Sequence, residues 1–207
     1  HAVDVFERTS GTFQRLDAQA CGFAYRDSVF KHDPERWLVI AVEFKLAPSL
    51  QTAALKLDYA GIRDELSSMG IATPDARHVA DAVIRLRRSK LPDPAVVGNA
   101  GSFFKNPIVA VAQAEGLLAA HPRLPVFRGD GDATRKLSAA WLIDACGWKG
   151  HRDGDAGVSD KHALVLVNHG RATGAELLAL ARRIADSVHA RFGIAVEPEP
   201  RIVGAHW

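Results

Sequence analysis

The sequence has few cysteines, no long apolar run and almost no net charge, and each absence excludes a class of protein. Cys21 and Cys146 lie far apart, so they form no metal motif and no disulfide framework, and we expect reduced thiols. No apolar stretch approaches the ~18 residues that a membrane span needs. The formal charge of +2, from dispersed basic residues, is too small to indicate nucleic-acid binding. A cytoplasmic protein that binds neither membrane nor nucleic acid is expected.

The composition is that of an ordinary globular protein. Of the 207 residues, 47% are hydrophobic and 24% are charged, which allows one large domain or two small ones with a real core. The densest basic cluster, Arg85, Arg87 and Arg88, lies on a predicted helix and is interpreted as a solvated face. No internal repeat and no low-complexity linker divides the chain.

Hydrophobic periodicity predicts an α+β fold, with strands at both ends and helices concentrated in the middle. Thr73 and Pro74 favour a helix start, with the threonine hydroxyl as N-cap and the proline in the first turn. The predicted strands are 3–7, 12–16, 37–46, 163–167 and 194–196, the first two joined as a hairpin through Thr9-Ser10-Gly11. The predicted helices are 73–88, 112–120, 137–146 and 173–192.

The last helix has the clearest signals. Thr173 and Glu176 form a capping-box pattern at its start, and Gly193 follows as a C-terminal stop. Between them, apolar residues recur at spacings of four, three, four and four, which predicts one buried stripe. The residues of this stripe are Leu177, Ala181, Ile184, Val188 and Phe192.

The segment Gly98–Pro107, with the sequence GNAGSFFKNP, carries the strongest indication of function. Its two glycines let the backbone turn tightly and approach a ligand. Ser102, Lys105 and Asn106 add a hydroxyl, an ammonium and an amide beside a Phe-Phe pair that can anchor the loop. This mixture suits a polar, anionic small molecule and one residue that passes a proton. The glycine spacing fits neither the phosphate-binding loop of nucleotide hydrolases nor the dinucleotide fingerprint.

This segment resembles the serine motif of the UDP-N-acetylenolpyruvoylglucosamine reductase family. Four further segments resemble the same family in the expected order, so the resemblance covers nearly the whole chain. They are Tyr25–Lys31 (YRDSVFK), Lys90–Pro94 (KLPDP), Lys161–Asn168 (KHALVLVN) and Glu197–Gly204 (EPEPRIVG).

The resemblance implies an enzyme that reduces UDP-N-acetylglucosamine enolpyruvate, with hydride passing from NADPH to FAD and then to the substrate. It also implies two α+β domains. Residues 1–67 and 193–207 would complete a flavin-binding domain, and residues 68–192 would form the substrate-binding domain. Family members carry a large flavin-binding portion with a Gly-rich phosphate loop before the YRDS motif. This chain is therefore expected to be the C-terminal part of the enzyme, with FAD-binding residues unassigned and a monomer as the expected state.

The resemblance assigns catalytic roles to Ser102 and Arg26. Ser102 matches the proton donor, a role that requires a water-poor site because a serine hydroxyl is a weak acid. Without the resemblance, a turn serine bonded to neighbouring backbone is the simpler interpretation. Arg26 matches an arginine near the substrate carboxylate, where its planar donor fork suits a developing enolate. A surface ion pair with Asp27 is the alternative.

The third catalytic residue implied by the resemblance is Glu199, which would help to stabilise the intermediate. Glu197 is its rival on sequence alone, and Pro198 and Pro200 hold the segment extended. The family's usual residue at position 200 is not proline. This departure affects the expected local backbone geometry but not the assignment of Glu199.

Tyr59, Lys90 and Asn106 match substrate-binding positions of the family. Tyr25, beside Arg26, is a secondary candidate, either as a substrate-facing residue or as a packing residue. Tyr59 would lie on a loop that covers the substrate, and a core tyrosine is its alternative. Lys90 and Asn106 would contact the diphosphate or sugar. The alternative for each of them is an exposed structural role. His162 stands where the family commonly has glutamine, so a changed substrate hydrogen bond or a pH-sensitive site is expected.

No metal site is predicted. Asp153, Asp155 and Asp160 are spaced like calcium ligands, but Gly157 and Leu164 occupy positions where the calcium-loop pattern needs oxygen donors. An exposed acidic turn is the expectation there. Two other functions stay open at this stage: a fragment that binds the UDP-sugar without turnover, and an unrelated α+β interaction domain.

Overall fold

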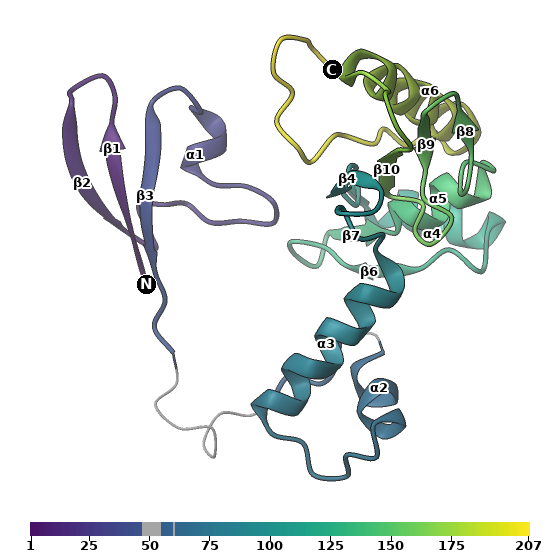
Figure 1. Ribbon diagram of the computed structural model, residues 1–207, viewed down its shortest axis with the longest axis horizontal. Helices are drawn as coiled ribbons and strands as arrows, with labels where there is room; N and C mark the ends of the chain where they lie inside the picture. The colour runs from purple at the N-terminus through teal and green to yellow at the C-terminus, as the bar shows by residue number, and fades with distance from the viewer. Residues whose placement is uncertain (47–54, 60) are drawn as a thin grey trace. The chain divides into compact units, whose positions relative to one another are not determined.

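The computed structural model describes residues 1–46, 55–59 and 61–207, which form two compact units, His1–Lys56 and Leu57–Trp207 (Figure 1). Strands and helices are mixed along the chain, so the predicted α+β class is confirmed. The strands are β1 Ala2–Glu7, β2 Thr12–Asp17, β3 Trp37–Glu43, β4 Gly98–Ser102, β5 Ile108–Ala110, β6 Val126–Arg128, β7 Thr134–Leu137, β8 Arg152–Asp153, β9 Ala156–Val158 and β10 Val165–Asn168. The helices are α1 Val29–His32, α2 Ile62–Ser68, α3 Ala76–Lys90, α4 Val111–Ala120, α5 Ala139–Ala145 and α6 Gly174–Phe192.

The smaller unit is a three-stranded antiparallel sheet in the order β2-β1-β3. The short helix α1 lies between β2 and β3 in the sequence. The predicted hairpin is confirmed, since Glu7 pairs with Thr12 across the turn. Its buried cluster is Val3, Val5 and Cys21, and burial raises the pKa of the Cys21 thiol. Neither cysteine of the chain forms a disulfide, as the sequence predicts.

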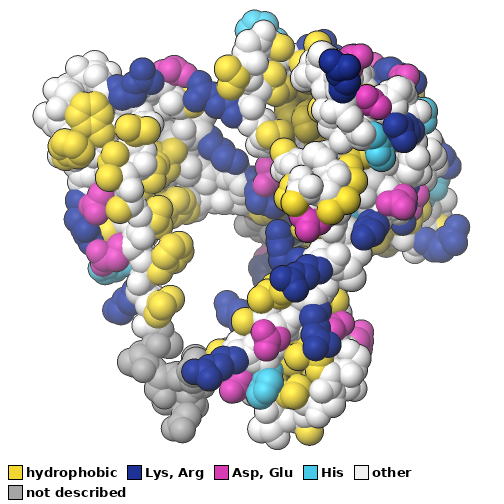
Figure 2. All heavy atoms as spheres, in the orientation of Figure 1, with side chains coloured by type: hydrophobic (Ala, Val, Ile, Leu, Met, Phe, Trp, Pro, Cys, Tyr) yellow, Lys and Arg dark blue, Asp and Glu magenta, His cyan; other side chains and the backbone are white. Residues whose placement is uncertain are grey.

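Strand β3 carries apolar side chains that stay exposed. The predicted strand is confirmed but ends at Glu43, and Leu38, Ile40 and Val42 are each about half exposed. Figure 2 shows apolar side chains in yellow over the strands of this unit. The buried core of the smaller unit is therefore small.

Glu7 links the stability of the smaller unit to pH. The pKa of Glu7 is lowered to about 2, mainly by hydrogen bonds from Ser10. Burial acts in the opposite direction and raises this pKa, whereas the ion pair with Arg36 lowers it further. A lowered carboxyl pKa stabilises the fold above the ordinary pKa of 4.5, and this stabilisation is lost as the pH falls towards 2.

We therefore expect Glu7→Gln to remove part of the acid-dependent loss of stability of residues 1–46. Urea unfolding of this unit, followed by NMR at several pH values, measures the effect. Glu35→Gln is the matched control, because Glu35 forms an exposed ion pair with Arg8. If both variants kept the pH dependence of the natural sequence, Glu7 would not be its source.

Helices α2 and α3 of the larger unit form a pair that buries Ile62, Leu66 and Ala82 (Figure 1). The predicted N-cap of α3, Thr73, is wrong. Asp75 caps the helix instead, because its carboxylate accepts hydrogen bonds from two backbone amides and the His78 ring accepts from the Asp75 amide.

The main core of the larger unit lies between two small antiparallel sheets and helices α4, α5 and α6. The sheets have the strand orders β4-β10-β9-β8 and β5-β7-β6. The predicted helix 112–120 is confirmed as α4, and the predicted strand 163–167 is confirmed as β10 with a later start. The predicted helix start at Leu137 is wrong, because Leu137 ends β7 and the Ser138 hydroxyl then accepts from the Trp141 amide to cap α5.

Helix α6 follows its sequence signals closely. The capping box of Thr173 and Glu176 is confirmed, and Gly193 ends the helix in the left-handed conformation with φ 65°. Four residues of the predicted stripe are buried, and Leu177 at its start is partly buried. The four are Ala181, Ile184, Val188 and Phe192.

The predicted strand 194–196 is wrong. Ile194 and Val196 are buried in the main core and Ala195 is exposed, so burial alternates as in a strand, but the backbone pairing with the segment around Phe104 begins only at Glu197. Proline has no N–H to extend a ladder. The assignment of 193–207 to a flavin-binding domain stays a prediction. Among the helices of the described ranges, none is long and apolar enough to cross a membrane.

Candidate functional site

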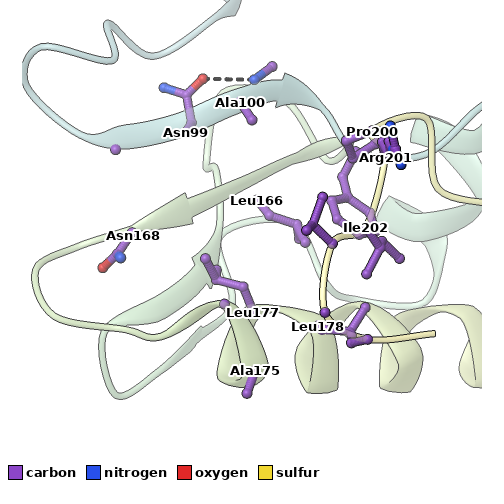
Figure 3. A pocket seen from close by; sticks show the side chains of 17 residues that line it. Asn99, Ala100, Leu166, Asn168, Ala175, Leu177, Leu178, Pro200, Arg201 and Ile202 are labelled. Carbon is purple, nitrogen blue, oxygen red and sulfur yellow. Dashed lines mark hydrogen bonds between the residues drawn. The ribbon is translucent and has the colours of Figure 1, made fainter. Parts of the chain in front are cut away.

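The segment with the two glycines begins as strand β4 and turns sharply before Ser102. Gly101 has φ 77°, a left-handed conformation that glycine adopts without strain. The Asn99 side chain fixes this turn, since its oxygen accepts from the Gly101 amide at 3.1 Å and its nitrogen donates to Pro92 and Val97 carbonyls (Figure 3). The tight turn predicted from the glycines is therefore confirmed.

The backbone after Ser102 is held on both sides by other segments. The Phe103 amide donates to the Leu164 carbonyl at 2.7 Å, and the Phe103 carbonyl accepts from the Glu199 amide at 2.7 Å. Phe104 is only 1% exposed and belongs to the main core, as expected for an anchor. Ser102 and Glu199, almost a hundred residues apart in sequence, are thereby brought to neighbouring positions.

The rival acid, Glu197, has a different environment. Its carboxylate forms an ion pair with Lys105 at 3.2 Å, and its side chain is 66% exposed. The backbone of the same two residues is also paired, through the Lys105 amide and the Glu197 carbonyl. Glu197 thus has a structural partner at the surface, whereas Glu199 is partly buried beside Phe103.

Asn106 supports the start of a helix. Its side-chain oxygen accepts from the amide of Ala139, the first residue of α5, at 2.9 Å. This satisfies one of the amides that a helix start leaves unpaired. The amide NH₂ of Asn106 is the part of the side chain that can donate to a ligand, so the structural role and the predicted one use different atoms.

Three basic side chains from separate elements act on one another near this segment. Lys90 is the last residue of α3, Lys149 lies in the turn after α5, and His162 precedes β10. Burial is the main cause that lowers the pKa of His162, and the charges of Lys90 and Lys149 lower it further. Sequence reasoning did not single out Lys149, because nothing local distinguishes it from other surface lysines. Figure 2 shows Lys and Arg side chains gathered along α3.

A cavity of about 630 Å³ opens next to the serine segment (Figure 3). Its walls come from β4, β10, the start of α6 and residues 200–205, and Leu166, Leu177 and Ile202 make it largely apolar. Asn99 and Asn168 lie on its strands, and their side chains also form hydrogen bonds with nearby backbone. Gly101 and Phe103 line it on either side of Ser102. The cavity thus has a largely apolar wall, and Ser102 itself is not among the residues that line it.

The acidic residues after α5 have protein partners. Asp153 pairs with Arg183 at 2.6 Å, and Asp155 accepts from the Arg171 amide at 2.8 Å. That backbone bond is the main cause that lowers the pKa of Asp155. In the part of the chain that the structure describes, no group of three His, Cys, Asp or Glu residues is placed to hold a metal ion.

Comparison with known proteins decides the family. Residues 93–203 match the C-terminal domain of UDP-N-acetylenolpyruvoylglucosamine reductase. The chain belongs to the UDP-N-acetylenolpyruvoylglucosamine reductase family. Reductases of this name from Xanthomonas axonopodis pv. citri and Xylella fastidiosa are each 60% identical to it over 207 residues, all of this chain and 58% of each relative. The chain therefore spans little more than half of these relatives.

The structural comparison gives the same family. A crystal structure of UDP-N-acetylenolpyruvylglucosamine reductase from Thermus caldophilus matches with a TM-score of 0.52 and 26% sequence identity. The match covers 96% of this chain and 50% of that protein. The predicted family and the α+β fold are thus confirmed.

Tyr25 and Arg26, two residues that the family resemblance singles out, form the centre of a tight turn in the smaller unit. Ala24 and Asp27 pair on either side, and Arg26 has φ 56°, a left-handed conformation that is uncommon without glycine. Such strain is concentrated at functional sites. The hydrogen bond with the His32 ring is the main cause that lowers the pKa of Asp27. Shared use of Arg26, Ser102 and Glu199 stays a prediction.

Tyr59 lies just before α2, and its carbonyl accepts from the Ile62 amide. The side chain is 72% exposed, so the alternative of a core tyrosine is wrong. An exposed aromatic ring can cover a sugar or base, as the family resemblance implies. Part of the segment before it, residues 47–54, lies outside the described residues.

Proposed function

We propose that the protein containing this chain is an oxidoreductase that reduces UDP-N-acetylglucosamine enolpyruvate to UDP-N-acetylmuramate in peptidoglycan precursor synthesis, with FAD and NADPH. One observation supports the proposal most. Backbone pairing holds Glu199 beside Phe103, the residue after Ser102, and Phe103 lines a largely apolar cavity. A weakly acidic hydroxyl, a carboxyl and a nearby apolar surface suit the protonation of a carbon.

The reaction adds a hydride to the β-carbon of the enolpyruvyl group and a proton to the α-carbon. Hydride addition leaves negative charge on the carboxylate side of the substrate. Arg26 would stabilise this charge through its fixed guanidinium, and Glu199 would share in stabilising it. Ser102 would donate its hydroxyl proton to the α-carbon, completing the reduced product.

Residues 1–46 do not by themselves provide a site for the diphosphate of FAD. A flavin dinucleotide needs backbone amides or a helix start to hold its diphosphate. Residues 1–46 contain only Gly11 and Gly22, and α1 has four residues. The described part of the smaller unit therefore supplies no diphosphate cradle, and the chain's own contribution is binding, charge and the proton.

The second candidate is a unit that binds the UDP-sugar without turnover, which the 58% coverage of the relatives favours. Mixing the chain with FAD, NADPH and substrate separates the two. Substrate-dependent oxidation of NADPH would support an active enzyme. Binding without oxidation would support the second candidate, and failure to bind UDP-sugars at all would contradict both.

Lys90→Ala is expected to weaken UDP-sugar binding about 10- to 100-fold, the value of a charged hydrogen bond, and to change the rate of substrate reduction much less. Calorimetry measures the first effect, and stopped-flow kinetics of the complete enzyme measures the second. Arg87→Ala is the matched control, because it removes another exposed positive charge from the last turn of α3. An unchanged dissociation constant for Lys90→Ala would remove the assignment.

A further inference from the structure

Residues 197–207 form a strap that leaves the serine segment and returns to it. At one end of the strap, the Glu199 amide donates to the Phe103 carbonyl at 2.7 Å. At the other end, the indole of Trp207 packs on both phenylalanines, with its ring centroid 6.1 Å from that of Phe103 and 6.0 Å from that of Phe104. These distances lie in the range of favourable aromatic pairs. The strap is therefore closed on the serine segment at both ends.

Helix α6 holds the far end of the strap. The Arg182 side chain donates to the His206 carbonyl. Trp207 also borders a hollow of about 410 Å³ with Ala185 of this helix. Figure 1 shows the strap in yellow, with its end beside α6. Residues 200–205, between the two ends, form one wall of the larger cavity (Figure 3). The end of the strap is thus fixed separately from its start.

Phe103 is the residue through which the strap reaches Ser102. Its amide and its carbonyl both form backbone hydrogen bonds of 2.7 Å, the second with the Glu199 amide, so its backbone is fixed on two sides. Its ring is partly buried, 5.0 Å from that of Phe104, and Trp207 completes a cluster of three rings. Consecutive Cα atoms stay ~3.8 Å apart, so a shift of Phe103 displaces Ser102 and the backbone of Glu199 together.

Trp207 contributes little to the main core. It is 44% exposed, whereas Phe104 is 1% exposed and belongs to that core. Losing a half-exposed ring leaves no enclosed cavity, so the larger unit is expected to keep most of its stability without it. The effect of removing Trp207 should therefore fall on the serine segment rather than on the fold.

We propose that Trp207 is a positioning residue for the reaction, which keeps the strap closed so that Ser102 and Glu199 hold the spacing needed for proton transfer. The inference rests on the proposed function, because that function assigns the proton to Ser102. The role of Trp207 is indirect, through Phe103 and the strap. Proton transfer depends steeply on geometry, and a misplacement of about 1 Å costs on the order of 10² in rate.

Stopped-flow kinetics of the complete enzyme tests the inference. Trp207→Ala should slow substrate reduction about 10- to 100-fold with little change in the KM for the substrate. Flavin reduction by NADPH should be unchanged, because only the second half-reaction needs the proton. Trp207→Phe keeps a ring against Phe103 and should recover most of the rate. Urea unfolding should show nearly the same midpoint for both variants and the natural sequence.

Hydrogen exchange gives a second readout that does not depend on turnover. The Glu199 amide is protected by its bond to the Phe103 carbonyl. Trp207→Ala should speed exchange of this amide about tenfold, and Trp207→Phe should leave it close to the natural rate. Phe127→Ala is the matched control, because Phe127 is a half-exposed aromatic residue on β6, outside the cluster of three rings. It should change neither the exchange nor the two half-reactions.

An unchanged exchange rate of the Glu199 amide in Trp207→Ala would overturn the inference, and so would an unchanged rate of substrate reduction. Equal slowing of both half-reactions, or no recovery in Trp207→Phe, would show a general structural role and overturn it too. If the natural enzyme reduces no UDP-sugar while exchange of the Glu199 amide still depends on Trp207, the proposed function is at fault instead.

Discussion

Ser102→Ala in the complete enzyme is expected to slow substrate reduction by about 10²- to 10⁴-fold and to leave flavin reduction by NADPH unchanged. The range is that of a positioned proton donor. The hydroxyl would act only when the α-carbon needs its proton, so the first half-reaction does not use it. Stopped-flow measurement of the two half-reactions separates the effects.

Ser138→Ala is the matched control for that experiment. Ser138 lies in the same unit, and its hydroxyl accepts from the Trp141 amide at the start of α5. Losing this cap should cost about 1 kcal/mol of stability and spare both half-reactions. If Ser102→Ala slowed both half-reactions equally, its hydroxyl would be supporting the structure rather than passing a proton.

Features predicted correctly from the sequence are those fixed by neighbouring residues. Thr173, Glu176 and Gly193 set the ends of α6 through contacts within one turn, and the structure has all three. The turn at Gly101 belongs to the same class. Where two local signals compete, the stronger acceptor decides: the Asp75 carboxylate caps α3 because it holds two amides at once, whereas the Thr73 hydroxyl would offer a single weaker acceptor.

Long-range pairing could not be predicted from the pattern alone. Residues 194–196 alternate in burial as a strand does, yet the backbone pairing begins only after them, at Glu197. The short strands β5 to β9 have two to four residues each, too few to show a period. The neighbourhood of Ser102, Glu199 and Lys149 depends on such contacts. Motifs therefore indicated Ser102 and Glu199, and only the fold shows that the charge of Lys149 acts on His162.

The second large effect concerns the core that holds the site together. Ile184→Ala is expected to lower the free energy of unfolding of the larger unit by about 2–5 kcal/mol. Ile184 is fully buried in α6, within the cluster that also contains Phe104, the anchor of the serine segment. Removing three carbons there leaves a cavity that tightly packed neighbours fill only in part.

Urea unfolding followed by tryptophan fluorescence measures this loss, since Trp141, Trp148 and Trp207 all lie in the larger unit. The midpoint should fall with little change in slope. Ile84→Ala is the matched control, because Ile84 is 46% exposed on α3 and alanine favours a helix. Equal effects of the two substitutions would mean that Ile184 does not support the core. A loss confined to Ile184→Ala, with weaker UDP-sugar binding only near its unfolding midpoint, would show that the core stabilises the site without contacting the ligand.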